Sequence, residues 1–279
     1  MTNDQRQMTN DKRRGVLLVG HGTRDARGTS QFFELSERLI EHLPGLRVEP
    51  CLLEFQSPTI PEAWDRLLER EVAKICVAPL LLFAAGHAKQ DIPEMVLESH
   101  IRRPDIEVTG ARPISRHPAI IELACSHLRH ALGQQQISAN EVTLVTVGRG
   151  SYDPCAQADM RMLGAIIASK LSIDDHHNAF YAMAEPKLPD VLEQIASSSA
   201  RQPSNSVRSI LVHPHLLFDG RLYQAIQKQI VEFRMKNPGI SIHLSSYLGA
   251  DKLVAQAMAD RVKSAFVSAA DFPVVPLTR

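Results

Sequence analysis

Short apolar runs alternate with longer amphipathic segments along the first hundred residues of the chain. The runs Val16 to Val19, Val48 to Phe55 and Ile75 to Phe83 predict strands, and the segments Ser30 to Leu43 and Ile60 to Arg70 have helical spacing. Continuous aliphatic runs such as VLLV are typical of strands that are buried on both faces. The alternation therefore predicts an α/β fold with parallel sheets, in which functional groups gather at the carboxyl ends of the strands.

The second half of the sequence repeats the first. LVGHGTRD at 18–25 corresponds to TVGRGSYD at 146–153, FQSPTIPEAWDRL at 55–67 to MAEPKLPDVLEQI at 183–195, and VAPLLLFAAGHA at 77–88 to VHPHLLFDGRL at 212–222, once one residue is deleted. Self-similarity on this scale indicates an internal duplication. We expect two similar three-layer domains, each with a parallel sheet.

The domain limits follow from the polar stretches. Residues 1–14 contain MTND twice and have no periodicity, which predicts a disordered leader. GQQQISAN at 133–140 is polar and aperiodic, so we place the join there. The expected domains are then residues 15–135 and residues 136–279.

Charge and cysteine usage exclude several classes of protein. Lys plus Arg equals Asp plus Glu at 31 each, so the broad positive field of a nucleic-acid or membrane-surface protein is missing. No apolar run approaches the length needed to span a bilayer. The N-terminus, MTNDQRQMTNDKRR, is polar rather than a charged prefix to an apolar signal core, and we expect a cytoplasmic protein. The four cysteines are scattered and predict small buried hydrophobic side chains rather than disulfides or a zinc site.

The two repeats differ at the positions where ligands bind in such folds. The first repeat has His21, Glu54 and His87 at strand ends or in the turns that follow them. Their counterparts in the second repeat are Arg149, Ala182 and Arg221, respectively. Because the glycine-flanked framework is kept while these residues change together, we predict that the first repeat carries the chemistry.

Two imidazoles and a carboxylate suit a divalent transition metal and leave positions open for exchange. We therefore predict that His21 and His87 bind the metal. We predict Glu54 to be a partly buried carboxylate that accepts a proton or assists the metal. Taken singly, the residues also fit two turn histidines and a salt-bridged glutamate.

Four residues of the second repeat carry further hypotheses. Arg149 and Arg221 are predicted to bind substrate carboxylates, because a guanidinium offers two parallel donors; the alternative is a plain surface role. His213 and His215 lie on the same side of a predicted strand, which permits either a second metal site or two buried histidines.

Several motifs together resemble the sirohydrochlorin chelatases, the cobaltochelatase and ferrochelatase family. The matching segments are GHGTRD (20–25), LLEFQSP (52–58), PLLLFAAGHAKQDIPE (79–94), VGRGSYDPCAQADM (147–160), AEPKLPDVL (184–192) and PHLLFDGRL (214–222). The resemblance spans nearly everything from residue 16 to about residue 250, and LLLFAAGHAKQDIP is its most specific string.

This resemblance implies a chelatase-like fold with the tetrapyrrole between two domains. It also implies that His21 and His87 match the family's metal-handling histidines and that Glu54 matches its acidic position. The expected activity is insertion of cobalt(II) or iron(II) into sirohydrochlorin, in cobalamin or siroheme biosynthesis. We expect no organic cofactor and no iron–sulfur cluster.

Two other functions are the alternatives to a chelatase: a carrier and a histidine phosphatase. A non-catalytic tetrapyrrole or metal carrier would use the same ligands, and turnover distinguishes it from an enzyme. A histidine phosphatase is disfavoured because Gly20 stands where that chemistry needs a cation before the histidine. The residues do not select between cobalt and iron, and both a monomer and a homodimer are compatible with the duplication.

Overall fold

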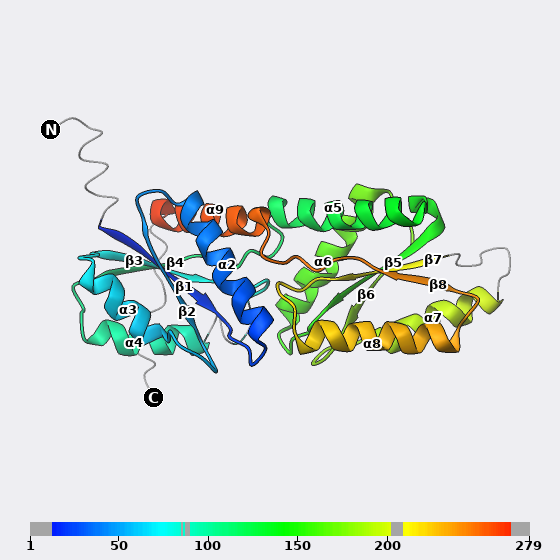
Figure 1. Cartoon of the computed structure of the whole chain (residues 1–279), viewed down its shortest axis with the longest axis horizontal. Coiled ribbons are helices and arrows are strands. Elements are labelled where there is room, and N and C mark those ends of the chain that lie inside the picture. The colour runs from blue at the N-terminus through cyan, green and yellow to red at the C-terminus, as the bar shows by residue number, and fades with distance from the viewer. Residues whose placement is uncertain (1–12, 85, 87–89, 202–208, 269–279) are drawn as a thin grey trace. The chain divides into compact units, whose positions relative to one another are not determined.

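The computed structural model describes residues 13–84, 86, 90–201 and 209–268. Two four-stranded parallel sheets, each flanked by helices, make up the described chain (Figure 1). The strand orders are β2-β1-β3-β4 in the first sheet and β6-β5-β7-β8 in the second. Because the two orders are equivalent, the predicted α/β class and the internal duplication are confirmed.

Helices and strands alternate strictly along the sequence. The first half contains β1 (Arg14–Gly20), α2 (Ala26–His42), β2 (Arg47–Leu52), α3 (Ile60–Glu69), β3 (Lys74–Pro79), α4 (Ile92–Ile101), β4 (Glu107–Gly110) and α5 (Pro118–Gln135). After the 3-10 helix η2 (Ala139–Glu141), the second half contains β5 (Val142–Gly148), α6 (Pro154–Leu171), β6 (His176–Phe180), α7 (Leu188–Arg201), β7 (Ser209–Pro214), α8 (Arg221–Lys236), β8 (Ser241–Leu244) and α9 (Lys252–Ser268).

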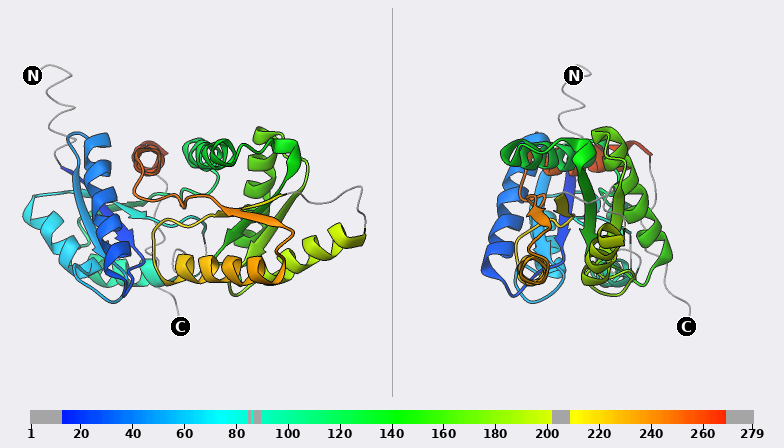
Figure 2. Two further views of the ribbon diagram at one scale, coloured as in Figure 1. Left: turned by 45° about the vertical axis from the view of Figure 1, so that its right-hand side comes forward. Right: turned by 90° about the vertical axis from the view of Figure 1, so that its right-hand side faces the viewer.

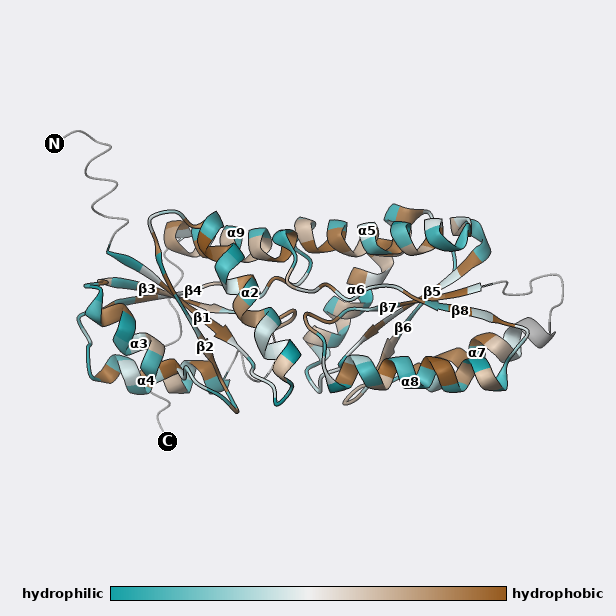
Figure 3. Cartoon of the chain, viewed as in Figure 1, coloured by the Kyte–Doolittle hydropathy of each residue, from teal (hydrophilic) through white to brown (hydrophobic). Residues whose placement is uncertain are grey.

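Each sheet is the middle of three layers. In the first sheet, α3 and α4 cover one face, and α2 and α9 pack against each other on the opposite face (Figure 2). In the second, α7 and α8 cover one face and α5 and α6 the other. The hydrophobic colour in Figure 3 runs along the central strands β1 and β5, which are buried between two helical layers. This burial explains their uninterrupted aliphatic sequences.

Side-chain caps determine where the helices begin. Asp25 accepts hydrogen bonds from the amides of Arg27 and Gly28, so α2 begins at Ala26, four residues before the predicted start. Thr59 and Glu62 form a capping box at the start of α3, as its sequence TIPE favours. The predicted ends of two strands are wrong: β2 ends at Leu52 and β3 at Pro79, which are the last residues of each strand in register with β1.

The compact units do not follow the two halves of the sequence. One unit comprises Met1–Ser115 with Ala250–Arg279, and the other comprises Arg116–Gly249. Helix α5 packs against α6 of the second unit, whereas α9 packs against α2, β3 and β4 of the first. The ranges 15–135 and 136–279 therefore differ from the observed units, since each unit takes the closing helix of the other repeat. We call these units 1 and 2.

The structure also bears on the predictions for the N-terminal leader, the cysteines and membrane-spanning segments. Residues 1–12 of the predicted leader lie outside the described residues, but Arg14 belongs to β1 and pairs with Lys74 of β3. Its guanidinium carbon lies 5.4 Å from the ring centroid of Phe266. All four cysteines are free, and three are buried as predicted, whereas Cys155 is exposed near the start of α6. Within the described residues, no helix is long and apolar enough to cross a membrane.

Candidate functional site

The candidate site of unit 1 is built on two turns that follow β1 and β2. The Leu53 amide donates to the Gly20 carbonyl (2.9 Å), and the Glu54 amide donates to the His21 carbonyl (3.1 Å). These bonds continue the parallel ladder past the ends of the strands. They bring His21 and Glu54, which are 33 positions apart in the sequence, onto adjacent backbone, as the strand-end prediction required.

Unit 2 contains the same pair of turns. The Tyr181 amide donates to the Gly148 carbonyl (2.9 Å), and the Ala182 amide donates to the Arg149 carbonyl (2.8 Å). Arg149 therefore occupies the backbone position of His21, and Ala182 that of Glu54. The alignment of the repeats made from sequence is thus reproduced in the hydrogen bonds, and the difference between the units lies in the side chains that a common backbone carries.

His21 and Glu54 have different surroundings. His21 is half-buried, and its Nδ1 lies 3.2 Å from the Gly22 carbonyl oxygen. Glu54 is exposed, so the expectation of a partly buried carboxylate is wrong. The reason is local: β2 has already ended at Leu52, and Glu54 lies in the turn between β2 and α3.

His87 lies outside the described residues, so its proximity to His21 stays a prediction. The Leu80 amide donates to the Val19 carbonyl (2.8 Å), which places the exit of β3 beside the end of β1. Within the described residues, no group of three or more His, Cys, Asp or Glu side chains has the arrangement of a metal site. A metal site that includes His87 would lie partly outside the described residues.

One residue pair next to the site was not predicted. The guanidinium carbon of Arg24 lies 5.0 Å from the ring centroid of Phe55, and the ring is 53% exposed. The apolar run Val48 to Phe55 predicts Phe55 to be the last residue of a strand. The structure places it in the turn after Glu54, with a positive φ of 73°.

Gly22 is required by the contact between the two turns. Its φ is +86°, and a Cβ at this position would overlap the Glu54 carbonyl oxygen. We expect Gly22→Ala to lower the free energy of unfolding by about 2 kcal/mol or more, because left-handed backbone and a steric clash both oppose the side chain. Urea unfolding measures this loss.

Gly133→Ala is the matched control for this substitution. Gly133 lies in α5, and a Cβ there would have no neighbour within 4 Å. Alanine at this helical position is expected to stabilise the protein by about 0.5–1 kcal/mol. Equal effects of the two substitutions would contradict a special role for the Gly22 turn.

Arg149 and Arg221 are both exposed at the carboxyl end of the second sheet. Arg149 follows β5 directly, and Arg221 is the first residue of α8. An exposed guanidinium at a strand end is accessible to an anionic ligand. Substrate binding by these two residues stays a prediction.

His213 and His215 form a buried pair in unit 2. Their side chains are 0% and 1% exposed, with ring centroids 5.8 Å apart. The Nδ1 of His213 lies 2.8 Å from the Ser245 hydroxyl. Burial lowers the pKa of His215 to about 3; burial, together with His215 and His127, lowers the pKa of His213. These observations favour the buried-histidine alternative over a second metal site.

The buried pair predicts a loss of stability in acid. Well above pH 6.5, the ordinary pKa of histidine, the His215 side chain is neutral in both the folded and the unfolded chain. Between pH 6.5 and about 3, His215 binds a proton in the unfolded chain but stays neutral in the folded one, so acid favours unfolding. We expect the free energy of unfolding to fall by about 2 kcal/mol between pH 7 and pH 5 through His215, and His213 is expected to act in the same direction. Urea unfolding at the two pH values measures the change.

His215→Leu restores the residue of the first repeat, Leu80, and is expected to remove its share of this pH dependence. His130→Ala, at an exposed position of α5, serves as the control and is expected to leave the pH dependence unchanged. An unaltered pH dependence in His215→Leu would contradict the assignment.

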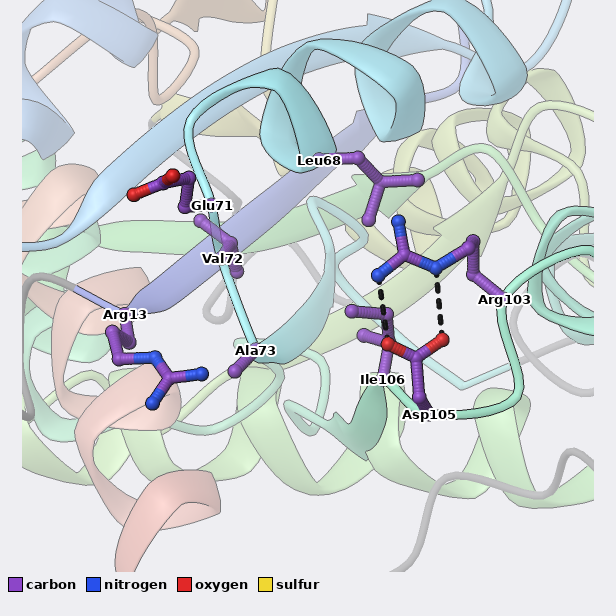
Figure 4. Close-up of a pocket in the computed structure, with 8 residues that line it drawn as sticks. All are labelled: Arg13, Leu68, Glu71, Val72, Ala73, Arg103, Asp105 and Ile106. Atoms are coloured by element: carbon purple, nitrogen blue, oxygen red, sulfur yellow. Dashed lines mark hydrogen bonds and ion pairs between the residues drawn. The ribbon is translucent and has the colours of Figure 1, made fainter.

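A hollow of about 480 Å³ lies at the opposite end of the first sheet (Figure 4). Its lining residues are Arg13, Leu68, Glu71, Val72, Ala73, Arg103, Asp105 and Ile106. Arg103 and Asp105 pair at 2.7 Å, and this hydrogen bond lowers the pKa of Asp105 to about 2. Arg13 and Ala73 immediately precede β1 and β3, so the hollow is at the amino ends of strands whose carboxyl ends carry the candidate site.

Comparison with known proteins agrees with the duplicated architecture. The family model described as CbiX matches residues 15–131 and again residues 143–265. The chain belongs to the CbiX family. Two matches of one model to one chain reproduce the internal repeat, and each match begins within one residue of a first strand, at β1 and at β5.

Curated relatives of this CbiX family member carry chelatase names. It is 29% identical over 250 residues to the sirohydrochlorin ferrochelatase of Priestia megaterium, a match that covers 89% of each chain. It is 25% identical over 236 residues to the sirohydrochlorin cobaltochelatase of the same organism, covering 85% of this chain and 74% of the relative.

Two solved structures of SirB superimpose on most of the chain. SirB from Bacillus subtilis with Fe3+ matches with a TM-score of 0.81 and 25% identity, covering 93% of this chain and 99% of that one. The sirohydrochlorin chelatase SirB from Bacillus subtilis subspecies spizizenii in complex with cobalt matches with a TM-score of 0.76 and 26% identity, covering 91% and 95%.

Proposed function

We propose that this protein is a sirohydrochlorin chelatase, which inserts cobalt(II) or iron(II) into the tetrapyrrole. Two observations support the proposal: the chain belongs to the CbiX family, and it is similar to two sirohydrochlorin ferrochelatases and to one sirohydrochlorin cobaltochelatase. One structural observation carries it furthest. The two units present the same pair of turns, but an imidazole and a carboxylate occupy them in unit 1, and Arg149 and Ala182 in unit 2.

Metallation exchanges two pyrrole N–H protons for one divalent ion. The protein must therefore hold a partly dehydrated metal against one face of the macrocycle and accept protons from the other reactant. In our proposal, His21 and His87 hold the metal as neutral imidazoles. When the His21 Nδ1 carries the proton and donates to the Gly22 carbonyl, the ligating lone pair is on Nε2.

Glu54 is the proposed proton acceptor. Its amide is bonded to the His21 carbonyl, so its carboxylate starts from backbone that adjoins the metal-binding residue. Its exposure leaves it accessible to a substrate and to water, which takes the proton away after transfer. Either imidazole would serve as the acceptor for the second proton once the metal has left it.

Arg149 and Arg221 are proposed to bind carboxylates of the substrate. A sirohydrochlorin-type tetrapyrrole carries several acidic arms, and guanidinium groups bind carboxylates through paired hydrogen bonds. Both arginines replace proposed metal ligands of unit 1, so the second unit is suited to an anion and not to a cation. The units would then divide metal handling and substrate binding between them.

Turnover tests the proposal and distinguishes an enzyme from a carrier. We expect the purified protein to accelerate metallation of sirohydrochlorin by cobalt(II) or iron(II) above the uncatalysed rate, followed anaerobically by absorbance. Tight binding of tetrapyrrole or metal without acceleration would overturn the enzyme assignment in favour of a carrier. Parallel assays with the two metals identify the preferred one.

A further inference from the structure

Phe55 is a large aromatic residue held at the surface beside the candidate site. Its side chain is 53% exposed, although phenyl rings are usually buried. It directly follows Glu54, whose amide is bonded to the His21 carbonyl. A single exposed hydrophobic residue is common on protein surfaces; Phe55 differs from such residues in the way its ring is held.

The backbone and one cation fix the ring outside the core. Phe55 has a φ of 73°, in the left-handed region that bulky residues avoid. The next residue, Gln56, is bonded through its backbone amide to the Glu54 carbonyl (3.0 Å) and through its side-chain oxygen to the Thr29 hydroxyl (2.9 Å). The guanidinium carbon of Arg24 lies over the ring, 5.0 Å from its centroid. The turn therefore presents the phenyl ring to solvent in a defined position.

The second unit has the same turn without this pair. Met183 occupies the Phe55 position with a φ of 58° and 37% exposure, and Tyr152 occupies the Arg24 position. The unusual backbone thus belongs to the turn in both repeats. The ring and the guanidinium occur together in the unit that also carries His21 and Glu54.

We propose that Phe55 and Arg24 position the tetrapyrrole over the metal-handling residues of unit 1. This inference rests on the proposed chelatase function. The substrate is a flat conjugated ring with carboxylates on its periphery, and an exposed phenyl ring offers it a contact surface. Arg24 lies beside that surface and binds one peripheral carboxylate. The pair is specific for the organic substrate and makes no bond to the metal.

Binding of metal-free sirohydrochlorin, followed by absorbance, tests the pair directly. We expect Phe55→Ala to weaken binding about 10-fold and to raise the KM for the tetrapyrrole, while the KM for the metal stays unchanged. Phe55→Tyr keeps the ring and is expected to bind within about twofold of the unaltered protein. Arg24→Ala is expected to weaken binding and Arg24→Lys to restore part of it, because lysine keeps the charge without the paired donors.

Met183→Ala is the matched control, since it truncates the side chain at the same turn position of unit 2. It is expected to change tetrapyrrole binding less than Phe55→Ala. Unchanged binding in Phe55→Ala, with unfolding like that of the unaltered protein, would overturn the inference even if the protein metallates its substrate. Weakened binding in a protein without turnover would support the inference while the chelatase proposal failed.

Discussion

Replacement of His21 by alanine is expected to slow metallation of sirohydrochlorin about 100-fold or more. The side chain is half-buried and lies in a turn, so its removal takes away an imidazole without opening the core. The backbone bond between the Glu54 amide and the His21 carbonyl does not involve the side chain and survives the substitution. Anaerobic absorbance kinetics at saturating cobalt(II) and at limiting cobalt(II) measure the effect.

The controls for this prediction separate catalysis from folding. His130→Ala removes an exposed histidine of α5 and is expected to leave the rate unchanged. His87→Ala is expected to resemble His21→Ala if both imidazoles hold the metal. A rate within about twofold of the unaltered protein in His21→Ala would remove His21 from the mechanism.

Removal of helix α9 is expected to unfold unit 1. Its buried side chains, packed on unit 1, are Val254, Ala255, Ala257, Met258, Ala259, Val262 and Ala265. Burial of a valine or methionine is worth about 1.5–3 kcal/mol, and burial of an alanine about 0.8 kcal/mol, so the helix contributes roughly 12 kcal/mol as an upper value. This equals a large share of the 5–15 kcal/mol that stabilises a typical domain.

Hydrogen exchange tests this prediction unit by unit. In a chain that stops after Ala250, amides of β1 and β3 are expected to lose protection, because α9 packs on α2, β3 and β4. The Thr109 hydroxyl of β4 also loses its acceptor, the Ala265 carbonyl. Preserved protection of β1 and β3 in the shortened chain would contradict the packing.

Point substitutions in α9 provide a milder version of the same test. Val262 is 0% exposed and Val267 is 87% exposed on the same helix. Val262→Ala is expected to lower the free energy of unfolding by about 2 kcal/mol, through lost burial and a small cavity. Val267→Ala is expected to change it by less than about 0.5 kcal/mol.

The limits of the strands were harder to predict than their existence. Aliphatic runs located β1, β2 and β3, because only residues between two helical layers need to be apolar on both faces. The run at Val48 to Phe55 continues past the end of β2, since Leu53 and Phe55 are apolar although they lie in a turn. An apolar run indicates which side chains favour burial. The end of a strand depends instead on where its backbone pairing with the neighbouring strand ends.

The adjacent backbone positions of His21 and Glu54 were predictable, but the exposure of the Glu54 side chain was not. The repeat alignment paired His21 with Arg149 and Glu54 with Ala182, and the two units make their backbone bonds at these positions. The burial of Glu54 was predicted wrongly, because exposure depends on the path of the turn relative to the covering helices. The contact between Arg24 and Phe55 was not predicted for the same reason, because it depends on the path of this turn.

The sequence by itself determined that the chain contains two copies of one α/β pattern. It also determined that imidazole and carboxylate groups follow the strands of one copy, and guanidinium groups follow the strands of the other. It does so because burial on both faces and sharp glycine turns leave local signatures in the chain. The exchange of α5 and α9 between the units was decided by tertiary structure. Both helices are amphipathic and follow equivalent strands, so nothing local in either sequence states which sheet it covers. That choice depends on the apolar surfaces that meet when the whole chain has folded.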